Sequence, residues 1–248
     1  MRAWFLSDIH LKSLNERNGN ILLRFLLSLQ DQTRPATHLF LLGDIFDFWV
    51  GDHTHYEKKF QPLVTAILQL QKQGLKIVYL EGNHDVHVVQ FWRRHGIECH
   101  VEDQYLELAG QVLRISHGDL INPNDTAYLR YREFVRRWYM EKLAHRLPAA
   151  QLERIGKVAS LKSRKRSVGK REDRSEQMRK LIRSYAEKCY AEKPFDLLIT
   201  GHMHVIDDWS WQPTGTQKTS RSINLGSWWQ EPKVLQWDGQ SLNWEKLE

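Results

Sequence analysis

A short apolar run, Leu39 to Leu42, leads directly into Gly43 and Asp44, and this junction constrains the fold more than any other part of the chain. The run has the length and flanks of a buried strand. A carboxylate at the end of a buried strand is costly unless a cation meets it, and in an α/β protein such an end commonly borders a ligand or metal site. We therefore expect Asp44 to be shared by two metal ions.

The same arrangement recurs along the chain, because four other apolar runs also end in polar residues. The runs cover residues 3–7, 76–80, 111–116 and 197–200, and the residues that follow them are Asp8, His10, Asn83, His84, His117, His202 and His204. The carboxyl ends of strands in an α/β sheet share one edge, so we expect these side chains to meet in one cleft.

The segments between the first three runs have helical periodicity. Residues 19–30 and 58–73 each carry apolar side chains on one face, which predicts a βαβαβ order. Further strands are expected at 105–108, 111–116, 220–224 and 234–237. The chain has 248 residues, and we find neither an apolar run long enough to span a membrane nor a signal peptide, so we expect a cytoplasmic protein.

The charge is unevenly distributed along the chain. Residues 130–193 contain 20 lysines and arginines against 8 acidic residues, a net charge of +12, whereas the remaining residues carry −6. The acidic part holds the expected metal ligands. The basic part predicts a surface for phosphate groups, nucleic acid or an anionic membrane, although a plain solvated basic face remains an alternative.

The types of ligand residue narrow the choice of metal ion. Nitrogen and oxygen donors without cysteine suit Mn²⁺, Zn²⁺, iron or cobalt better than Ca²⁺ or a thiolate zinc site. Seven candidates exceed what one ion needs. Two ions clamped on a phosphoryl group are a known arrangement for phosphoester hydrolysis.

The complete set of motifs resembles the calcineurin-like metallophosphoesterases. The family blocks D-x-H, GD, GNH[DE], H and GHxH correspond to Asp8-x-His10, Gly43-Asp44, Gly82-Asn83-His84-Asp85, His117 and Gly201-His202-x-His204. The resemblance implies an αββα sandwich and two divalent ions, for which we expect Mn²⁺. It also implies that Asp8, His10 and His204 hold one ion and Asn83, His117 and His202 the other, with Asp44 between them. His84 would act at the phosphate, as an acid or as a hydrogen-bond donor.

Within that family, the chain is similar to the UDP-2,3-diacylglucosamine diphosphatases of lipid A synthesis. The similarity lies in Gly43-Asp44-x-Phe46-x-x-Trp49-x-Gly51-Asp52 and in Asn124-Asp125-x-x-Tyr128. It implies hydrolysis of a UDP-linked acylated glucosamine to UMP and 2,3-diacylglucosamine 1-phosphate, by a peripheral protein at the inner face of the cytoplasmic membrane. Those enzymes usually have arginine at the position of His84.

We expect residues 125–193 to form a helical, basic lid inserted into a core made of residues 1–124 and 194–248. The substrate contacts expected from this region are Asp125, Tyr128, Ser163, Arg164, Arg166, Ser167 and Lys170. Apolar stripes at 128–138 and 178–189 fit either packing between lid helices or a groove for acyl chains. Asp85 and Asp119 are expected to orient the ligand histidines.

Two other functions remain open at this point. A phosphodiesterase or phosphatase acting on a nucleotide or nucleic acid would also use a +12 segment. A scaffold that kept the fold without catalysis is disfavoured, because every ligand position is filled.

Overall fold

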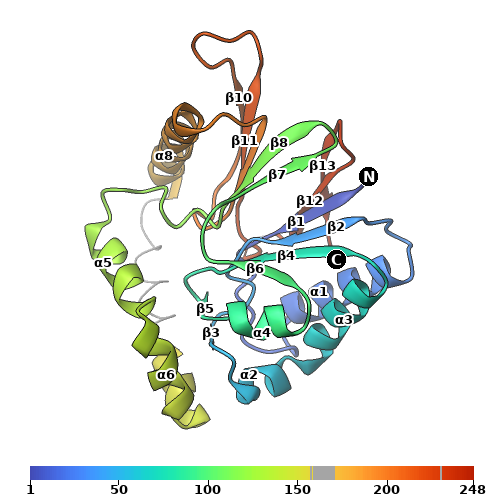
Figure 1. Cartoon of the computed structure of the whole chain (residues 1–248), viewed down its shortest axis with the longest axis vertical. Helices are drawn as coiled ribbons and strands as arrows, with labels where there is room; N and C mark the ends of the chain where they lie inside the picture. Colours follow the sequence, from blue (N-terminus) through green and yellow to red (C-terminus); the bar gives the residue numbers. More distant parts are fainter. Residues whose placement is uncertain (157, 159–170, 230) are drawn as a thin grey trace.

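A computed structural model of the chain describes residues 1–156, 158, 171–229 and 231–248. Two β-sheets face each other (Figure 1). The first has the strand order β13 (Leu242–Lys246), β12 (Lys233–Trp237), β1 (Ala3–Leu6), β2 (His38–Leu41), β4 (Lys76–Leu80) and β6 (Glu98–His100). The second has the order β10 (Ile206–Trp211), β11 (Ser220–Leu225), β9 (Leu197–Thr200), β8 (Gln111–Ile115) and β7 (Gln104–Leu108). A short parallel pair joins β3 (Trp49–Val50) to β5 (Asp85–Val86).

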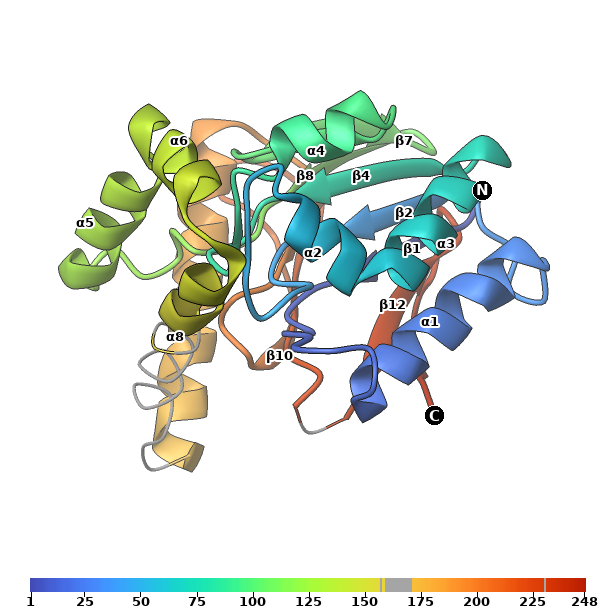
Figure 2. The same ribbon diagram turned by 90° about the horizontal axis from the view of Figure 1, so that it is seen from below.

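Helices cover the outer faces of both sheets. The described helices are α1 (Arg17–Gln30), α2 (Thr54–Lys59), α3 (Gln61–Lys72), α4 (Val89–Arg94), α5 (Thr126–Val135), α6 (Trp138–Arg146) and α8 (Arg171–Glu192). Helices α1 to α4 lie on the side of the first sheet, and α8 lies on the side of the second (Figure 1). Helices α5 and α6 extend from one end of the sandwich (Figure 2). Within the described residues, every helix is too short or too polar to cross a bilayer.

Strand alternation explains the layers. Trp4 and Leu6 face the helices, whereas Phe5 faces the second sheet, where it stacks on Phe40 with ring centroids 4.6 Å apart. Separate apolar clusters therefore lie outside the first sheet, between the sheets, and between the second sheet and α8. The predicted αββα class and βαβαβ order are confirmed.

Two local predictions need correction. The single helix expected at 58–73 is two helices, α2 and α3, which meet at Phe60; Pro62 lies in the first turn of α3, where its missing N–H costs no hydrogen bond. Strand β10 was not predicted, because its Asp207 and Asp208 interrupt the apolar pattern. Arg183 of α8 pairs with Asp207 at 2.8 Å and Arg221 of β11 with Asp208 at 2.7 Å, so these carboxylates are accommodated in a strand.

The region expected to be a lid divides into two environments. Ala186 and Cys189 of α8 are buried against Phe195 and Leu198 of the second sheet, so the stripe at 178–189 packs on the core. Helices α5 and α6 instead expose several apolar side chains: Tyr131, Phe134, Trp138, Tyr139 and Leu143. The lid boundaries at 125 and 193 stay a prediction, with α8 contributing to the core.

Candidate metal centre

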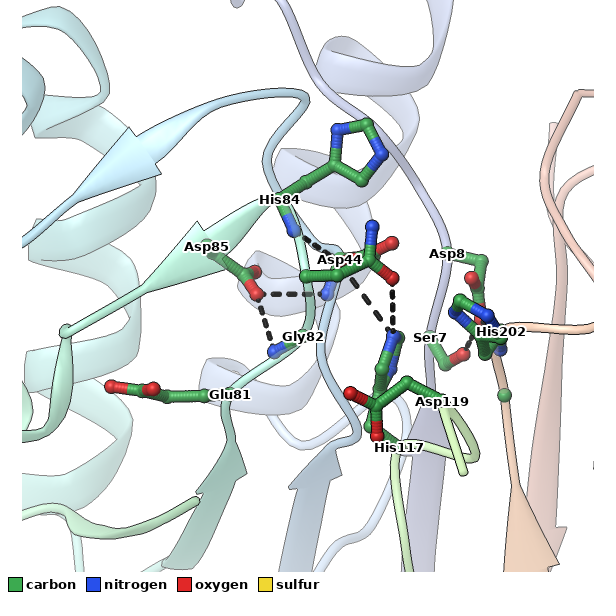
Figure 3. Close-up of polar contacts among 12 residues, drawn as sticks. Ser7, Asp8, Asp44, Glu81, Gly82, His84, Asp85, His117, Asp119 and His202 are labelled. Carbon is green, nitrogen blue, oxygen red and sulfur yellow. Dashed lines mark hydrogen bonds and ion pairs between the residues drawn. The ribbon is translucent and has the colours of Figure 1, made fainter. Parts of the chain in front are cut away.

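The predicted ligands come from the carboxyl ends of five strands in the two sheets. Strands β1, β2 and β4 are parallel neighbours in the first sheet, and β8 and β9 are parallel neighbours in the second. Figure 3 shows that side chains following these strands gather at one edge. The residues that form groups with mutually close ligand atoms are Asp8, His10 and His204; His10, Asp44 and His84; and Asp44, His117 and His202.

The first group has the spacing that a metal ion requires. His204 Nε2 lies 3.1 Å from Asp8 Oδ1, and 3.2 Å from His10 Nε2. Ligand atoms that each lie about 2.1 Å from one ion are themselves roughly 3.0 to 3.5 Å apart. Asp8 Oδ1 and His10 Nε2 are 3.8 Å apart, slightly beyond this range, so a small adjustment would let the three side chains share a cation. Without a cation, one imidazole can donate a hydrogen bond to the other.

The second group faces the first across Asp44. His117 Nε2 is 3.7 Å from Asp44 Oδ1 and 3.3 Å from Asn83 Oδ1. On the other side, Asp44 Oδ2 is 3.9 Å from His10 Nε2. The two carboxylate oxygens of Asp44, which is 1% exposed, thus point toward different histidines, as a carboxylate shared by two ions would.

Hydrogen bonds to the backbone fix two of the rings. His117 Nδ1 donates to the carbonyl of Leu42 at 2.8 Å, and His84 Nδ1 donates to the carbonyl of Asp47 at 2.8 Å. With Nδ1 protonated, the Nε2 atoms are left for a ligand or for a second proton. His10 Nδ1 and His202 Nδ1 are buried and have no hydrogen-bond partner in the described part of the chain. For His10 this is not the ring nitrogen that faces the other predicted ligands, because Nε2 is the atom close to His204, Asp8 and Asp44.

The backbone is strained at the same positions. Among the described residues, eight that are not glycine have a positive φ, and five of them are predicted ligands: Asp8, His10, Asp44, His202 and His204, with φ between 52° and 65°. Such conformations are uncommon outside glycine, and they cluster where function requires a particular side-chain direction.

Burial and charge set the ionisation of these groups. Burial alone would raise the pKa of Asp8, but the hydrogen bond and charge of His204 lower it below its ordinary value. Burial lowers the pKa of His202 to about 4, with a further contribution from the charge of His117. Burial alone would lower the pKa of His117, but the charges of Asp44 and Asp8 raise this pKa to about 8. The cluster thus combines anionic carboxylates with imidazoles that differ in basicity.

The family is decided by comparison with known proteins. Residues 1–206 match the family model for calcineurin-like phosphoesterases. The chain belongs to this family. It is therefore a hydrolase of the phosphoesterase class, a family that uses divalent metals, and the three residue groups are candidates for holding them.

Curated relatives extend the match over nearly the whole chain. A protein of Histophilus somni named UDP-2,3-diacylglucosamine hydrolase is 28% identical over 236 residues, which cover 95% of each chain. A protein of the same name from Neisseria meningitidis is 30% identical over 218 residues, covering 82% of this chain and 90% of the relative. A solved archaeal phosphodiesterase covers 100% of both chains at 12% identity with a TM-score of 0.52, which supports the fold.

Asp85 supports this phosphoesterase site differently from our expectation. Its carboxylate accepts hydrogen bonds from the backbone N–H groups of Asp44 at 3.0 Å, Ile45 at 2.9 Å and Gly82 at 2.7 Å, and from the Tyr79 hydroxyl. It therefore holds the backbone of the central aspartate and not a histidine. A Cβ on Gly82 would lie 2.0 Å from Asp44 Oδ1, so only glycine fits there.

The residues predicted to contact the substrate lie in different places relative to the metal cluster. Asp125 caps α5 by accepting from the N–H of Tyr128 at 3.0 Å. The Tyr128 hydroxyl donates to Asp119 at 2.9 Å, and its ring centroid is 5.5 Å from that of His202, so Tyr128 borders the site. Asp119 thus binds Tyr128 where we expected it to orient a histidine. Ser163, Arg164, Arg166, Ser167 and Lys170 lie outside the described residues.

Two arginines that join α5 to the site were missed. Arg132 Nε donates to Asp119 at 2.6 Å, and Arg136 Nη1 donates to the buried Glu81 at 2.8 Å. Residues 128, 132 and 136 follow the i, i+4, i+8 spacing of one helix face, which was the signal available in the sequence. Trp229 was also missed as a neighbour of the site; its ring centroid lies 4.5 Å from that of His204.

Proposed function

We propose that the chain hydrolyses the pyrophosphate bond of UDP-2,3-diacylglucosamine and releases UMP and 2,3-diacylglucosamine 1-phosphate. The observation that carries the proposal is the full-length similarity to proteins named UDP-2,3-diacylglucosamine hydrolase. The cluster of residues at the strand ends supports the proposal, because each position where the family has a metal ligand carries a residue able to bind metal.

We assign Asp8, His10 and His204 to one ion and Asn83, His117 and His202 to the other, with Asp44 shared. The close approach of the ligand atoms within each group supports this assignment. Mn²⁺ is the metal we propose from the family resemblance; the nitrogen and oxygen donors suit it, as they also suit Zn²⁺, iron and cobalt. When bound, two such ions supply positive charge for the phosphoryl group and make water acidic enough to act near neutral pH.

His84 is the proposed proton donor. Its Nδ1 is held by the Asp47 carbonyl, its ring lies 4.8 Å from that of His10, and it is 7% exposed. A water oxygen attacks one phosphorus and releases one proton to solvent, the bond from that phosphorus to the bridging oxygen breaks, and the departing phosphate takes a proton from the doubly protonated His84 at Nε2. The His84 backbone N–H also donates to Asp44 Oδ1 at 2.8 Å, which couples the positions of the two residues.

The lid is proposed to meet the acyl chains and the membrane. Trp138 is 71% exposed, Phe134 47% and Leu143 49%, and Lys142 lies over the Trp138 ring at 4.8 Å. Exposed aromatic and basic side chains suit the boundary between headgroups and acyl chains of an anionic bilayer. We propose a peripheral position at the cytoplasmic face of the inner membrane. Cosedimentation with vesicles containing anionic lipid tests this, and it should weaken on Trp138→Ser and on raising the salt concentration.

The deciding experiment is an assay of UMP release. Purified protein with Mn²⁺ is given UDP-2,3-diacylglucosamine, single-stranded DNA or bis-p-nitrophenyl phosphate in parallel. We expect UMP from the first substrate and little turnover of DNA. Efficient DNA cleavage without UMP release would favour the phosphodiesterase alternative, and metal binding without any turnover would favour a non-catalytic scaffold.

A further inference from the structure

Ser7 lies directly before Asp8, at the end of β1, and its side chain is buried beside the metal cluster. Only 2% of the residue is exposed, and its hydroxyl donates a hydrogen bond to Asp8 Oδ2 (Figure 3). Burying a hydroxyl costs free energy unless the group finds a hydrogen-bond partner, and here the partner is a predicted metal ligand. The Ser7 hydroxyl therefore acts on the orientation of the Asp8 carboxylate.

The same oxygen of Asp8 has a second donor, which comes from the other sheet. The backbone N–H of His202, in the loop after β9, donates to Asp8 Oδ2 at 2.8 Å. The other oxygen, Oδ1, faces the first group of predicted ligands and lies 3.1 Å from His204 Nε2 and 3.8 Å from His10 Nε2. The two donors on Oδ2 therefore fix the rotation of the carboxylate and determine which oxygen is presented to an ion.

Close packing between the two sheets leaves this contact little freedom. A Cβ on Gly201 would collide with Ser7 Oγ and with Asp8 Oδ2, so a side chain at position 201 would displace both. The Gly201 carbonyl is itself held, because it accepts a hydrogen bond from Nδ2 of the buried Asn224 at 2.6 Å. Ser7, at the end of a strand of the first sheet, thus packs directly against the loop that follows β9 of the second.

We propose that Ser7 is a positioning residue, which orients Asp8 toward the ion that Asp8, His10 and His204 would hold. This inference rests on the proposed function, in which those three residues hold one of two ions. Without the Ser7 hydroxyl, only the His202 N–H would hold Oδ2, and the carboxylate could rotate. Rotation would withdraw Oδ1 from the two imidazoles, so this ion would be bound more weakly while the other kept its ligands.

Metal binding measures the effect of Ser7 directly. The metal-free wild-type protein and the variant Ser7→Ala are titrated calorimetrically with Mn²⁺, and two binding steps are expected in the wild type. In Ser7→Ala we expect one step to weaken by about 10- to 100-fold, as for other residues that orient a ligand, and the other step to change little. The weakened step should be the one that His204→Gln abolishes. The Mn²⁺ concentration that gives half-maximal UMP release should rise by the same factor.

Ser222→Ala is the matched control. Ser222 is also a buried serine, in β11, but its hydroxyl has no hydrogen-bond partner in the part of the chain that the structure describes, so both Mn²⁺ affinities should stay at the wild-type level. Thermal unfolding of each metal-free variant shows whether the fold is retained. Unchanged affinity for both ions in Ser7→Ala would overturn the inference. An equal loss in both steps would do so too, because it indicates a general disturbance of the loop after β9.

The inference and the proposed function fail differently. If the wild-type protein binds two Mn²⁺ ions and releases UMP from UDP-2,3-diacylglucosamine, but Ser7→Ala binds both ions as tightly as the wild type, the inference fails alone. If the wild-type protein binds fewer than two ions, the proposed assignment of ligands fails. If it releases no UMP, the proposed substrate fails whatever the titrations show.

Discussion

The metal edge, which is the edge of the sandwich that carries the predicted ligands, and the lid helix α5 hold charged groups in contrasting ways. At the metal edge, buried carboxylates are fixed by backbone N–H groups, as when Asp85 accepts from Asp44, Ile45 and Gly82. At the lid, the long side chains of Arg132 and Arg136 reach the core carboxylates Asp119 and Glu81. The first arrangement is rigid, because backbone donors cannot move without disturbing the strands. The second depends on side chains that can release and rebind.

The contrast indicates that the two regions have different roles. Chemistry at a phosphoryl group requires ligand positions held to within a fraction of an ångström, which backbone contacts provide. Admission of the acylated substrate that we propose would require a segment that can move without breaking the core. Changes at the metal edge should therefore abolish catalysis, whereas changes at the lid contacts should alter substrate affinity.

The largest effect is expected at Asp44. Asp44→Asn keeps the shape of the side chain but removes the charge between the two ligand groups, so we expect kcat to fall by about 10³-fold or more. The rate of UMP release measures the loss of kcat. The metal content per chain is measured as well, and fewer than two ions should be retained. Glu98→Gln, which changes an exposed carboxylate bound to His100, is the control and should retain full activity. Near-normal turnover in Asp44→Asn would remove this aspartate from the centre of the site.

The second-largest effect is expected on substitution of Asp85, whose side chain contacts no predicted ligand atom. Burial and the charge of Asp44 raise the pKa of Asp85 to about 7. Asp85→Asn replaces a carboxyl group that accepts four hydrogen bonds by an amide that cannot accept all of them. We expect metal affinity to fall by about 10- to 100-fold, as for other residues that support a ligand, and the free energy of unfolding by about 3 kcal/mol. Tyr79→Phe removes one of the four donors, so a loss of only about 1 kcal/mol is expected. Equal losses in the two variants would argue against the backbone contacts as the main support.

That the predicted ligands lie close together was predictable from the sequence, because each of them follows the end of an apolar run. Asp44 and His117 follow strands of different sheets, so their approach also depends on how the two sheets pack, which the sequence pattern did not show. The role of Asp85 was not predictable, since it depends on the direction in which three N–H groups point after a turn. The place of Trp229 beside His204 was not predictable, because it depends on how the loop after β11 returns to the end of β1. The contacts of Arg132 depend on how α5 docks, which helix periodicity does not determine.

The ionisation of His117 predicts how metal binding varies with pH. In the metal-free protein Asp44 and Asp8 outweigh burial and raise the pKa of this imidazole to about 8. A ligand imidazole must lose its proton, so metal affinity should fall by roughly tenfold per pH unit below about pH 8. Because the folded pKa exceeds the ordinary 6.5, the bound proton stabilises the metal-free protein fully below pH 6.5, and this contribution is lost as pH rises through 8.

Calorimetry in buffers with different ionisation enthalpies measures this proton release, which should approach one proton per chain near pH 7. The variant His117→Gln should release fewer protons, whereas His100→Gln, outside the cluster, should behave as the wild type. Proton release that does not change in His117→Gln would assign the titration to another group.

The smallest effect is expected at the lid contacts, where neighbouring arginines offer a matched pair. The Arg136 side chain is 12% exposed and bonds to Glu81 and to the Gly82 carbonyl, whereas the Arg137 side chain is 52% exposed. Arg136→Met leaves the buried Glu81 without its cation, so α5 should open more readily, by about 1–3 kcal/mol. We expect faster amide exchange in residues 126–135 and a several-fold rise in KM for the acylated substrate, with turnover of bis-p-nitrophenyl phosphate unchanged. Arg137→Met should alter none of these. A fall in kcat for both substrates in Arg136→Met would show that this arginine supports the metal edge through Gly82, and the contrast between the two regions would then be wrong.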